Sequence, residues 1–125
     1  MAFQQRDLSG AVVKLKTVTD ASTEQTLAVA PQILRVVYTD HSGSITTGGA
    51  AQTMMAANTS RNGFCIQNTS SADLWVGFVG TAAAGGSSLK LPAGTLYESL
   101  PHGVPTGAIS IFGATTGQSF AAVEW

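Results

Sequence analysis

Residues 61–79 read RNGFCIQNTSSADLWVGFV, in which two short apolar runs are separated by a polar stretch. The runs, 64–67 and 74–79, contain the β-branched and aromatic residues that favour strands. Asn62 and Gly63 tolerate positive φ just before the first run, and the Asn-Thr-Ser-Ser stretch after it predicts a hairpin turn. This segment therefore predicts two consecutive strands.

The same alternation of short runs and turn residues continues to the C-terminus. Residues 91–94, Leu-Pro-Ala-Gly, place proline and glycine at the second and fourth positions of a type I turn, and residues 113–117 form a second link. With about ten residues between strands, the pattern predicts an all-β fold, an antiparallel β-sandwich or jelly-roll-like domain. The further strands that we expect are 88–91, 95–98, 108–112 and 118–124.

The first 40 residues differ from the rest of the chain in charge and in pattern. They hold eight of the thirteen charged side chains. We expect strands at 11–18 and 33–39, and a short helix within 23–30. The chain therefore divides into an extended N-terminal arm with the first strands, 1–40, and a β-sandwich module, 41–125.

The module is very poor in charge. In an average domain roughly a quarter of the residues are charged, so its surface is either coated with small polar residues or covered by partners. The net charge of −1 and the scattered basic residues do not indicate nucleic acid or a membrane surface as a partner. No apolar run is long enough for a membrane-spanning helix. The charged residues between His41 and the C-terminus are Arg61, Asp73, Lys90, Glu98 and Glu124.

Residues that could support catalysis or bind a metal are scarce. Asp40, His41 and Ser42 are adjacent, and neighbouring residues on a strand point to opposite faces, so they do not form a relay. His41, His102 and the single Cys65 match no zinc spacing. Cys65 lies in an expected strand, where a small buried hydrophobic residue is the simpler interpretation. We expect no enzyme activity, no metal site and no cofactor.

Residues 74–79 are apolar on both faces of the expected strand, which requires cover from a second sheet or from a neighbouring subunit. Trp125 is costly to leave exposed at the end of the chain. Trp75, Tyr97 and Trp125 could alternatively stack against a sugar. Our candidate oligomer interface consists of Leu74, Trp75, Val76, Phe78, Ile111, Phe112 and Trp125.

Residues 61–76 resemble a sequence type common among proteins of tailed bacteriophages. In that type a strand and turn of the form Arg-x-x-apolar-x-Ile-Gln-Asn-x-Ser precede a Leu-aromatic-Val strand. Residues 91–98, 104–115 and 116–121 resemble the rest of the same module, so the resemblance covers about 41–125. Proteins of this type are virion components: small β-sandwich decoration (cement) proteins on capsids, or β-rich parts of head and tail fibres. The pattern supplies no catalytic residues.

The resemblance implies a capsid decoration protein that stabilises a phage head by bridging capsomers, with the major capsid protein as its partner. We expect a homotrimer on the capsid surface of the virion, because cyclic symmetry lets each copy bury the apolar patch of another. The first residues, MAFQQRD, lack the features of a signal peptide, so we expect synthesis in the host cytoplasm. The alternative is a phage fibre or receptor-binding module that recognises a host surface glycan through Trp75 or Tyr97. In the leading hypothesis the arm docks on the capsid through Arg6, Lys14, Lys16 and Arg35.

Overall fold

The computed structural model describes residues 16–19, 25–28 and 35–125 of the chain. The chain divides into two compact units, 1–35 and 36–125, so that residues 36–40 belong to the second unit. The described part contains strands and no helix. The all-β prediction is therefore confirmed.

Two short strands form an antiparallel pair in the first unit. They are β1 (Lys16–Thr19) and β2 (Gln25–Ala28), with Lys16 opposite Ala28 and Thr19 opposite Gln25. β1 overlaps the end of the strand expected at 11–18. The short helix expected within 23–30 is wrong, because the backbone of β2 forms its hydrogen bonds with β1 instead of with its own preceding turn.

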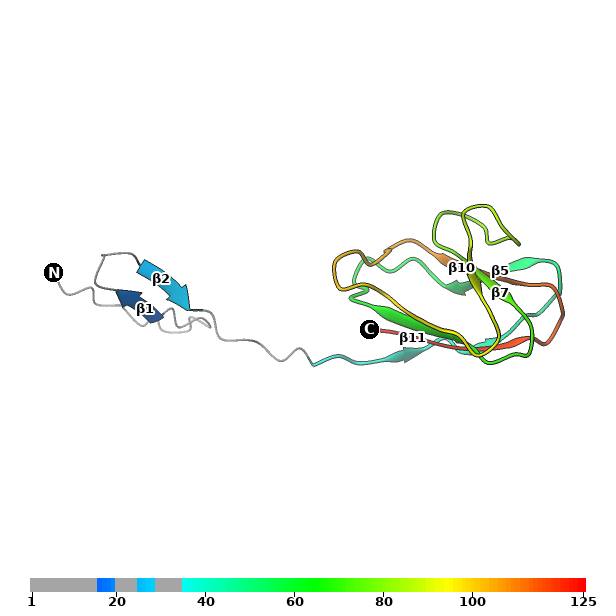
Figure 1. The fold of residues 1–125 in the computed structure, drawn as a ribbon, viewed down its shortest axis with the longest axis horizontal. Coiled ribbons are helices and arrows are strands. Elements are labelled where there is room, and N and C mark those ends of the chain that lie inside the picture. The colour runs from blue at the N-terminus through cyan, green and yellow to red at the C-terminus, as the bar shows by residue number, and fades with distance from the viewer. Residues whose placement is uncertain (1–15, 20–24, 29–34) are drawn as a thin grey trace. The chain divides into compact units, whose positions relative to one another are not determined.

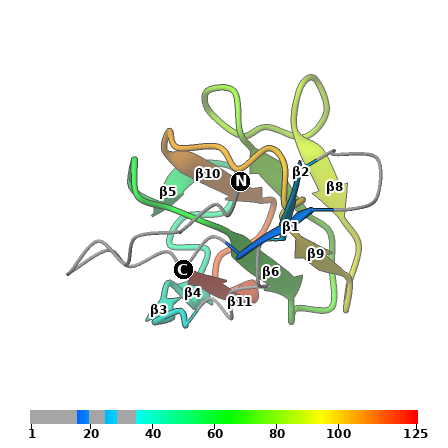
Figure 2. The same cartoon turned by 90° about the vertical axis from the view of Figure 1, so that its left-hand side faces the viewer.

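The second unit is a sandwich of two antiparallel sheets (Figures 1 and 2). One sheet has the order β3-β11-β6-β9, with β4 also paired to β11, and the other has the order β5-β10-β7-β8. The predicted antiparallel β-sandwich is confirmed. Its strands are β3 (Thr39–Asp40), β4 (Gly43–Ser44), β5 (Ala51–Met55), β6 (Phe64–Asn68), β7 (Leu74–Gly77), β8 (Leu89–Leu91), β9 (Leu96–Glu98), β10 (Ile109–Gly113) and β11 (Ser119–Glu124).

The strand pairing is nested along the chain. β4 pairs with β11, β5 with β10, β6 with β9 and β7 with β8. Three further pairs, β3 with β11, β6 with β11 and β7 with β10, complete the sheets. This is the strand order of a jelly roll, in which one long folded hairpin is rolled into two facing sheets.

Most connections cross from one sheet to the other, and two of the turn predictions are wrong in detail. β6 and β7 lie in different sheets, so the polar residues after β6 form an arch and not the expected hairpin. The turn before β9 starts at Pro92, one residue later than expected, since the Thr95 amide donates to the Pro92 carbonyl at 3.0 Å. Gly94 has φ +77° at the third position, which is typical of a type II turn.

The core lies between the sheets and follows the alternation of the strands. Along β10, Ile109 and Ile111 face inward and are fully buried, whereas Ser110 and Phe112 face outward and are half-buried. The largest buried side chains come from both sheets and from the segment before β5: Ile45, Met55, Phe64, Ile66, Leu74, Val76, Ile109 and Ile111.

Candidate interaction surfaces

Four of the five charged side chains between residues 41 and 125 pair with one another. Lys90 Nζ lies 2.7 Å from Asp73 Oδ2 on the surface, and Arg61 Nε lies 2.6 Å from Glu124 Oε2 inside the fold. Within this range only Glu98 has no ion-pair partner among the described residues. The module therefore presents an almost neutral surface to any partner.

Arg61 is a structural residue at the centre of a buried polar cluster. Its side chain is fully enclosed. Besides Glu124, the guanidinium donates to the carbonyls of Pro105 and Gly107 and, at 2.7 Å, to that of Ala56. These contacts attach the loop before β10 and the end of β5 to the last strand. The sequence contained one signal for this role, an arginine beside Asn-Gly in a segment almost without charge.

Glu124 is shared by two partners from distant parts of the chain. Its second carboxylate oxygen lies 2.9 Å from Nε2 of His41, which follows β3. Burial raises the pKa of the Glu124 carboxyl, but the hydrogen bonds from Arg61 and His41 outweigh burial and hold this pKa below its usual value. The carboxylate is therefore the ionised centre of the cluster.

Asn68 joins two of the arches that cross between the sheets, the one after β6 and the one after β8. Its side chain is fully buried, and its amide donates at 2.7 Å to the carbonyls of Ala72 and Leu91. Its side-chain oxygen accepts from the amide and the hydroxyl of Ser70. Every buried side-chain nitrogen or oxygen in the described residues has a hydrogen-bond partner. The side chains of Arg61 and Asn68 thus connect loops and strands of the module through hydrogen bonds.

Three of the residues expected in an oligomer interface lie elsewhere. Leu74, Val76 and Ile111 are at most 1% exposed and belong to the core between the two sheets. The second sheet of the same subunit covers them, so they have no side-chain surface to offer a neighbouring copy. The apolar character of the inward-facing residues in 74–79 is thus explained by the fold of one subunit, without a neighbouring copy.

The other expected interface residues remain accessible in part. Trp75 and Phe112 lie opposite each other on the outer face of β7 and β10, and Lys90 Nζ is 5.9 Å from the centre of the Trp75 ring. Phe78 forms a cluster with Phe64 and Tyr97, with ring centres 5.5 to 5.8 Å apart. The outer face of this sheet is therefore the part of the predicted interface with side chains free to contact another molecule.

Trp125 packs within its own subunit. Its carbonyl accepts from the amides of Asn62 and Gly63, and its ring lies so close to Gly63 that a Cβ there would be 2.5 Å from the indole. Tyr38 makes an edge contact with the same ring, with the ring centres 5.3 Å apart. The half-buried indole thus lies at one end of the five-stranded sheet, just beyond β11 and before β6.

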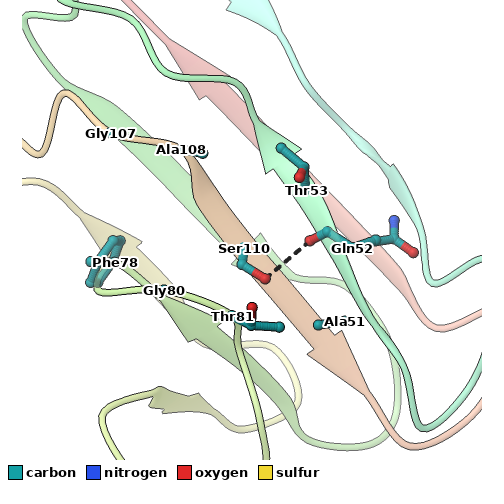
Figure 3. A pocket seen from close by; sticks show the side chains of 9 residues that line it. All are labelled: Ala51, Gln52, Thr53, Phe78, Gly80, Thr81, Gly107, Ala108 and Ser110. Atoms are coloured by element: carbon teal, nitrogen blue, oxygen red, sulfur yellow. Dashed lines mark hydrogen bonds between the residues drawn. The ribbon is translucent and has the colours of Figure 1, made fainter.

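An uncharged hollow of about 500 Å³ lies on the outer side of β10, between β5 and the loop that follows β7 (Figure 3). Thr53 and Thr81 lie on either side of Ser110, and the Phe78 ring lies at one end. Ala82 holds the loop in place, because it is 2% exposed and its amide donates to the Ser110 hydroxyl at 3.0 Å. The size is within the range of small-molecule sites.

A second hollow, of about 360 Å³, lies on the other side of Phe78. It opens beside the edge strand β9, where Tyr97 lies. Its lining is aromatic and apolar and consists of Phe64, Phe78, Tyr97, Gly103, Val104 and Pro105. Tyr97, which the sequence offered as a sugar-stacking residue, therefore faces a hollow, whereas Trp75 lies on the open sheet face.

The structure describes two of the four residues expected to dock on a capsid. Lys16 is the first residue of β1, and Arg35 is exposed just before the module. Arg6 and Lys14 lie outside the described residues. The docking role of all four stays a prediction.

Cys65 is half-buried on the outward side of β6, and not the fully buried residue expected from the sequence. Burial, and to a smaller extent the nearby Glu98 carboxylate, raises the pKa of its thiol. The described residues contain no cluster of three potential metal ligands. Nor does any helix in this part of the chain have the length and apolar character needed to cross a membrane.

Comparison with known proteins gives no family assignment. No family model matches the sequence, and no curated protein or solved structure matches it either.

Proposed function

We propose that the chain is a non-catalytic capsid decoration protein of a tailed bacteriophage, which binds the major capsid protein and bridges neighbouring capsomers. The observation that carries this proposal is the nearly complete internal pairing of the module's few charges. A surface on which Glu98 is almost the only unpaired charge does little to keep neighbouring molecules apart and suits close contact with other subunits. The resemblance of residues 41–125 to phage structural modules supplies the class of partner.

The way the module is built suits a mechanical role. The buried clusters around Arg61 and Asn68 connect loops and strands from both sheets, so a force on one loop is shared by the whole sandwich. The outer face with Trp75 and Phe112 offers apolar area for contact with a neighbour. In this proposal the copies form a homotrimer around that face and share the load that packaged DNA places on the shell.

The N-terminal arm is proposed as the segment that grips the shell. It forms a separate unit, and it contains Arg6, Lys14, Lys16 and Arg35, four of the six basic residues of the chain. The module itself retains only two basic side chains, each in an ion pair. The basic groups that could attract an acidic site on the capsid therefore lie mainly in the arm.

Truncation of the arm tests this division of roles. Removal of residues 1–20 should leave a folded oligomer that no longer binds empty capsids in a co-sedimentation assay. The double variant Lys14→Gln with Lys16→Gln should weaken binding to capsids. Its control on the module, Lys90→Gln, should leave that binding unchanged. Undiminished binding by the truncated protein would overturn the arm assignment.

The hollow in Figure 3 favours one second candidate, a phage fibre or receptor-binding module for a host surface glycan. Its lining has no charged residue and combines an aromatic ring, Phe78, with the hydroxyls of Thr53 and Thr81. Binding on an array of neutral glycans, lost in Thr53→Val and Thr81→Val and retained in the exposed Thr115→Val, would favour this function. Binding to capsids without binding to any glycan would favour decoration.

A further inference from the structure

The segment just before the module has the residues of a strand but no strand partner among the described residues. Residues 35–38, Arg-Val-Val-Tyr, are rich in strand-forming side chains, and yet they belong to no strand in the structure. Val37 is 87% exposed and Tyr38 is 61% exposed, the first and fourth most exposed of the large hydrophobic side chains whose burial the structure describes. Such a segment can gain both hydrogen bonds and burial from an added strand.

The segment continues directly into an open edge of the five-stranded sheet. Thr39 and Asp40 form β3, which pairs on one side with β11. β3 is the last strand in the sheet order, so its other side has no strand partner in the described part of the chain. A strand added along residues 35–40 would extend an existing sheet rather than start a new one.

The charges of the segment are complementary to those of a second copy of itself. Arg35 and Asp40 stand at its two ends, too far apart along an extended chain to pair with each other. In an antiparallel register centred between Val37 and Tyr38, each Arg35 lies opposite the Asp40 of the other copy. Val37 then lies opposite Tyr38, a pair of the aromatic and β-branched type that stabilises sheets.

We propose that residues 35–40 form an antiparallel strand pair with the same segment of a second copy, related by a two-fold axis. The five-stranded sheets of the two modules then join into one continuous sheet. Each Val37 is covered by the other copy, and the edge contact of Tyr38 with Trp125 holds the aromatic ring beside the new pair. A two-fold contact uses the same patch on both copies, as this self-complementary segment requires.

The contact does not depend on the decoration role. A two-fold pair doubles whatever unit the module otherwise forms, so that it gives a dimer from single chains or a hexamer from trimers. The partner is a second copy because the segment begins with a basic residue and ends with an acidic one. In an antiparallel pair, the basic end of each copy therefore meets the acidic end of the other. Pairing with a strand of another protein is a competing outcome that the same measurement separates.

A charge exchange tests the register. The mass of the full chain is measured by light scattering after gel filtration at micromolar concentration, with circular dichroism as a check of folding. Arg35→Asp and Asp40→Arg should each shift the mass towards half of the original value, since each places like charges opposite each other. The double exchange, Arg35→Asp with Asp40→Arg, should restore the original mass. A double variant no heavier than the single variants would overturn the proposal.

A second pair of variants tests the apolar part of the contact. Val37→Asp should halve the mass, because it buries a carboxylate opposite Tyr38. Val79→Asp, at a residue 79% exposed beyond the end of β7, should leave the mass unchanged. Equal effects of the two variants, or a wild-type chain that is monomeric or an assembly of odd number, would contradict a two-fold contact at residues 35–40.

Discussion

Arg61 and Glu124 are separated by 63 positions in the sequence, yet Nε of Arg61 donates to Oε2 of Glu124 at 2.6 Å in the interior of the jelly roll. The carboxylate belongs to the last strand, and the guanidinium also binds carbonyls in the loop before β10 and after β5. This pair therefore closes the module at the end where its last strand finishes. It also removes two of the module's few charges from the surface.

Arg61→Met should be strongly destabilising. It leaves the Glu124 carboxylate buried beside His41, and it leaves the carbonyls of Pro105 and Gly107 without their donor. Loss of one partner of a buried ion pair costs about 3–5 kcal/mol. The free energy of unfolding in urea measures the effect.

Lys90→Met is the matched control for that variant. Lys90 pairs with Asp73 at 2.7 Å, but both side chains are nearly half exposed. The loss should therefore be about 1 kcal/mol or less. Similar losses from the two substitutions would contradict the structural role assigned to Arg61.

Acid should weaken the module through Glu124. The pKa of this carboxyl is lowered in the folded state, so its contribution to stability is present above the unfolded pKa and is lost as pH falls through the folded pKa. Glu124→Gln should flatten the dependence of unfolding free energy on pH below the usual carboxyl value of 4.5. In Asp40→Asn, where an exposed carboxylate with a lowered pKa accepts from Ser42, the change should be smaller. An unaltered profile in Glu124→Gln would be inconsistent with this account.

Asn68→Ala should separate the two arches. The substitution removes both donors to Ala72 and Leu91 and the acceptor for Ser70. Each buried polar group left without a partner costs about 1–3 kcal/mol, so the total should be at least about 2 kcal/mol in urea unfolding. Ser70→Ala removes one hydroxyl near the surface and should cost about 1 kcal/mol or less. A milder loss for Asn68→Ala than for Ser70→Ala would count against this assignment.

Gly63→Ala should displace the terminal tryptophan. An added Cβ would lie 2.5 Å from the Trp125 ring, closer than any real contact. We expect a loss of about 1–3 kcal/mol and a changed near-ultraviolet circular dichroism signal. Gly103→Ala meets no atom within 4 Å and should leave both measurements close to wild type. If Gly63→Ala behaved like this control, Trp125 would not pack as described.

The sequence predicted the later strands better than the earlier ones. The runs that became β6 to β11 contain apolar residues bounded by Gly, Pro or Asn, and each was located within about two residues. β5, Ala51–Met55, contains only one residue of a type that favours strands, Thr53, and β4 has two residues. These strands form because β10 and β11 offer them hydrogen bonds, and a local pattern does not contain that information.

The arrangement of the site was harder to predict than the strands. Leu74, Val76 and Ile111 are apolar, and both a core and a subunit interface require apolar side chains. The sequence alone does not distinguish the two, and the interface was the wrong choice for these three residues. The pairing of Arg61 with Glu124 depends on the tertiary fold, because it requires the last strand to lie beside the segment that contains Arg61. The low number of charges predicted a neutral or covered surface, but it did not predict which charges pair with one another.

The central claim is that the chain decorates a phage capsid, and imaging of the virion that contains it by electron cryo-microscopy tests that claim most directly. The account predicts density of the size of this jelly roll on the outer capsid surface where capsomers meet, and loss of that density when residues 1–20 are deleted. Density for the module in the tail or at a fibre tip, with a capsid surface that does not change on deletion of the whole chain, would contradict it.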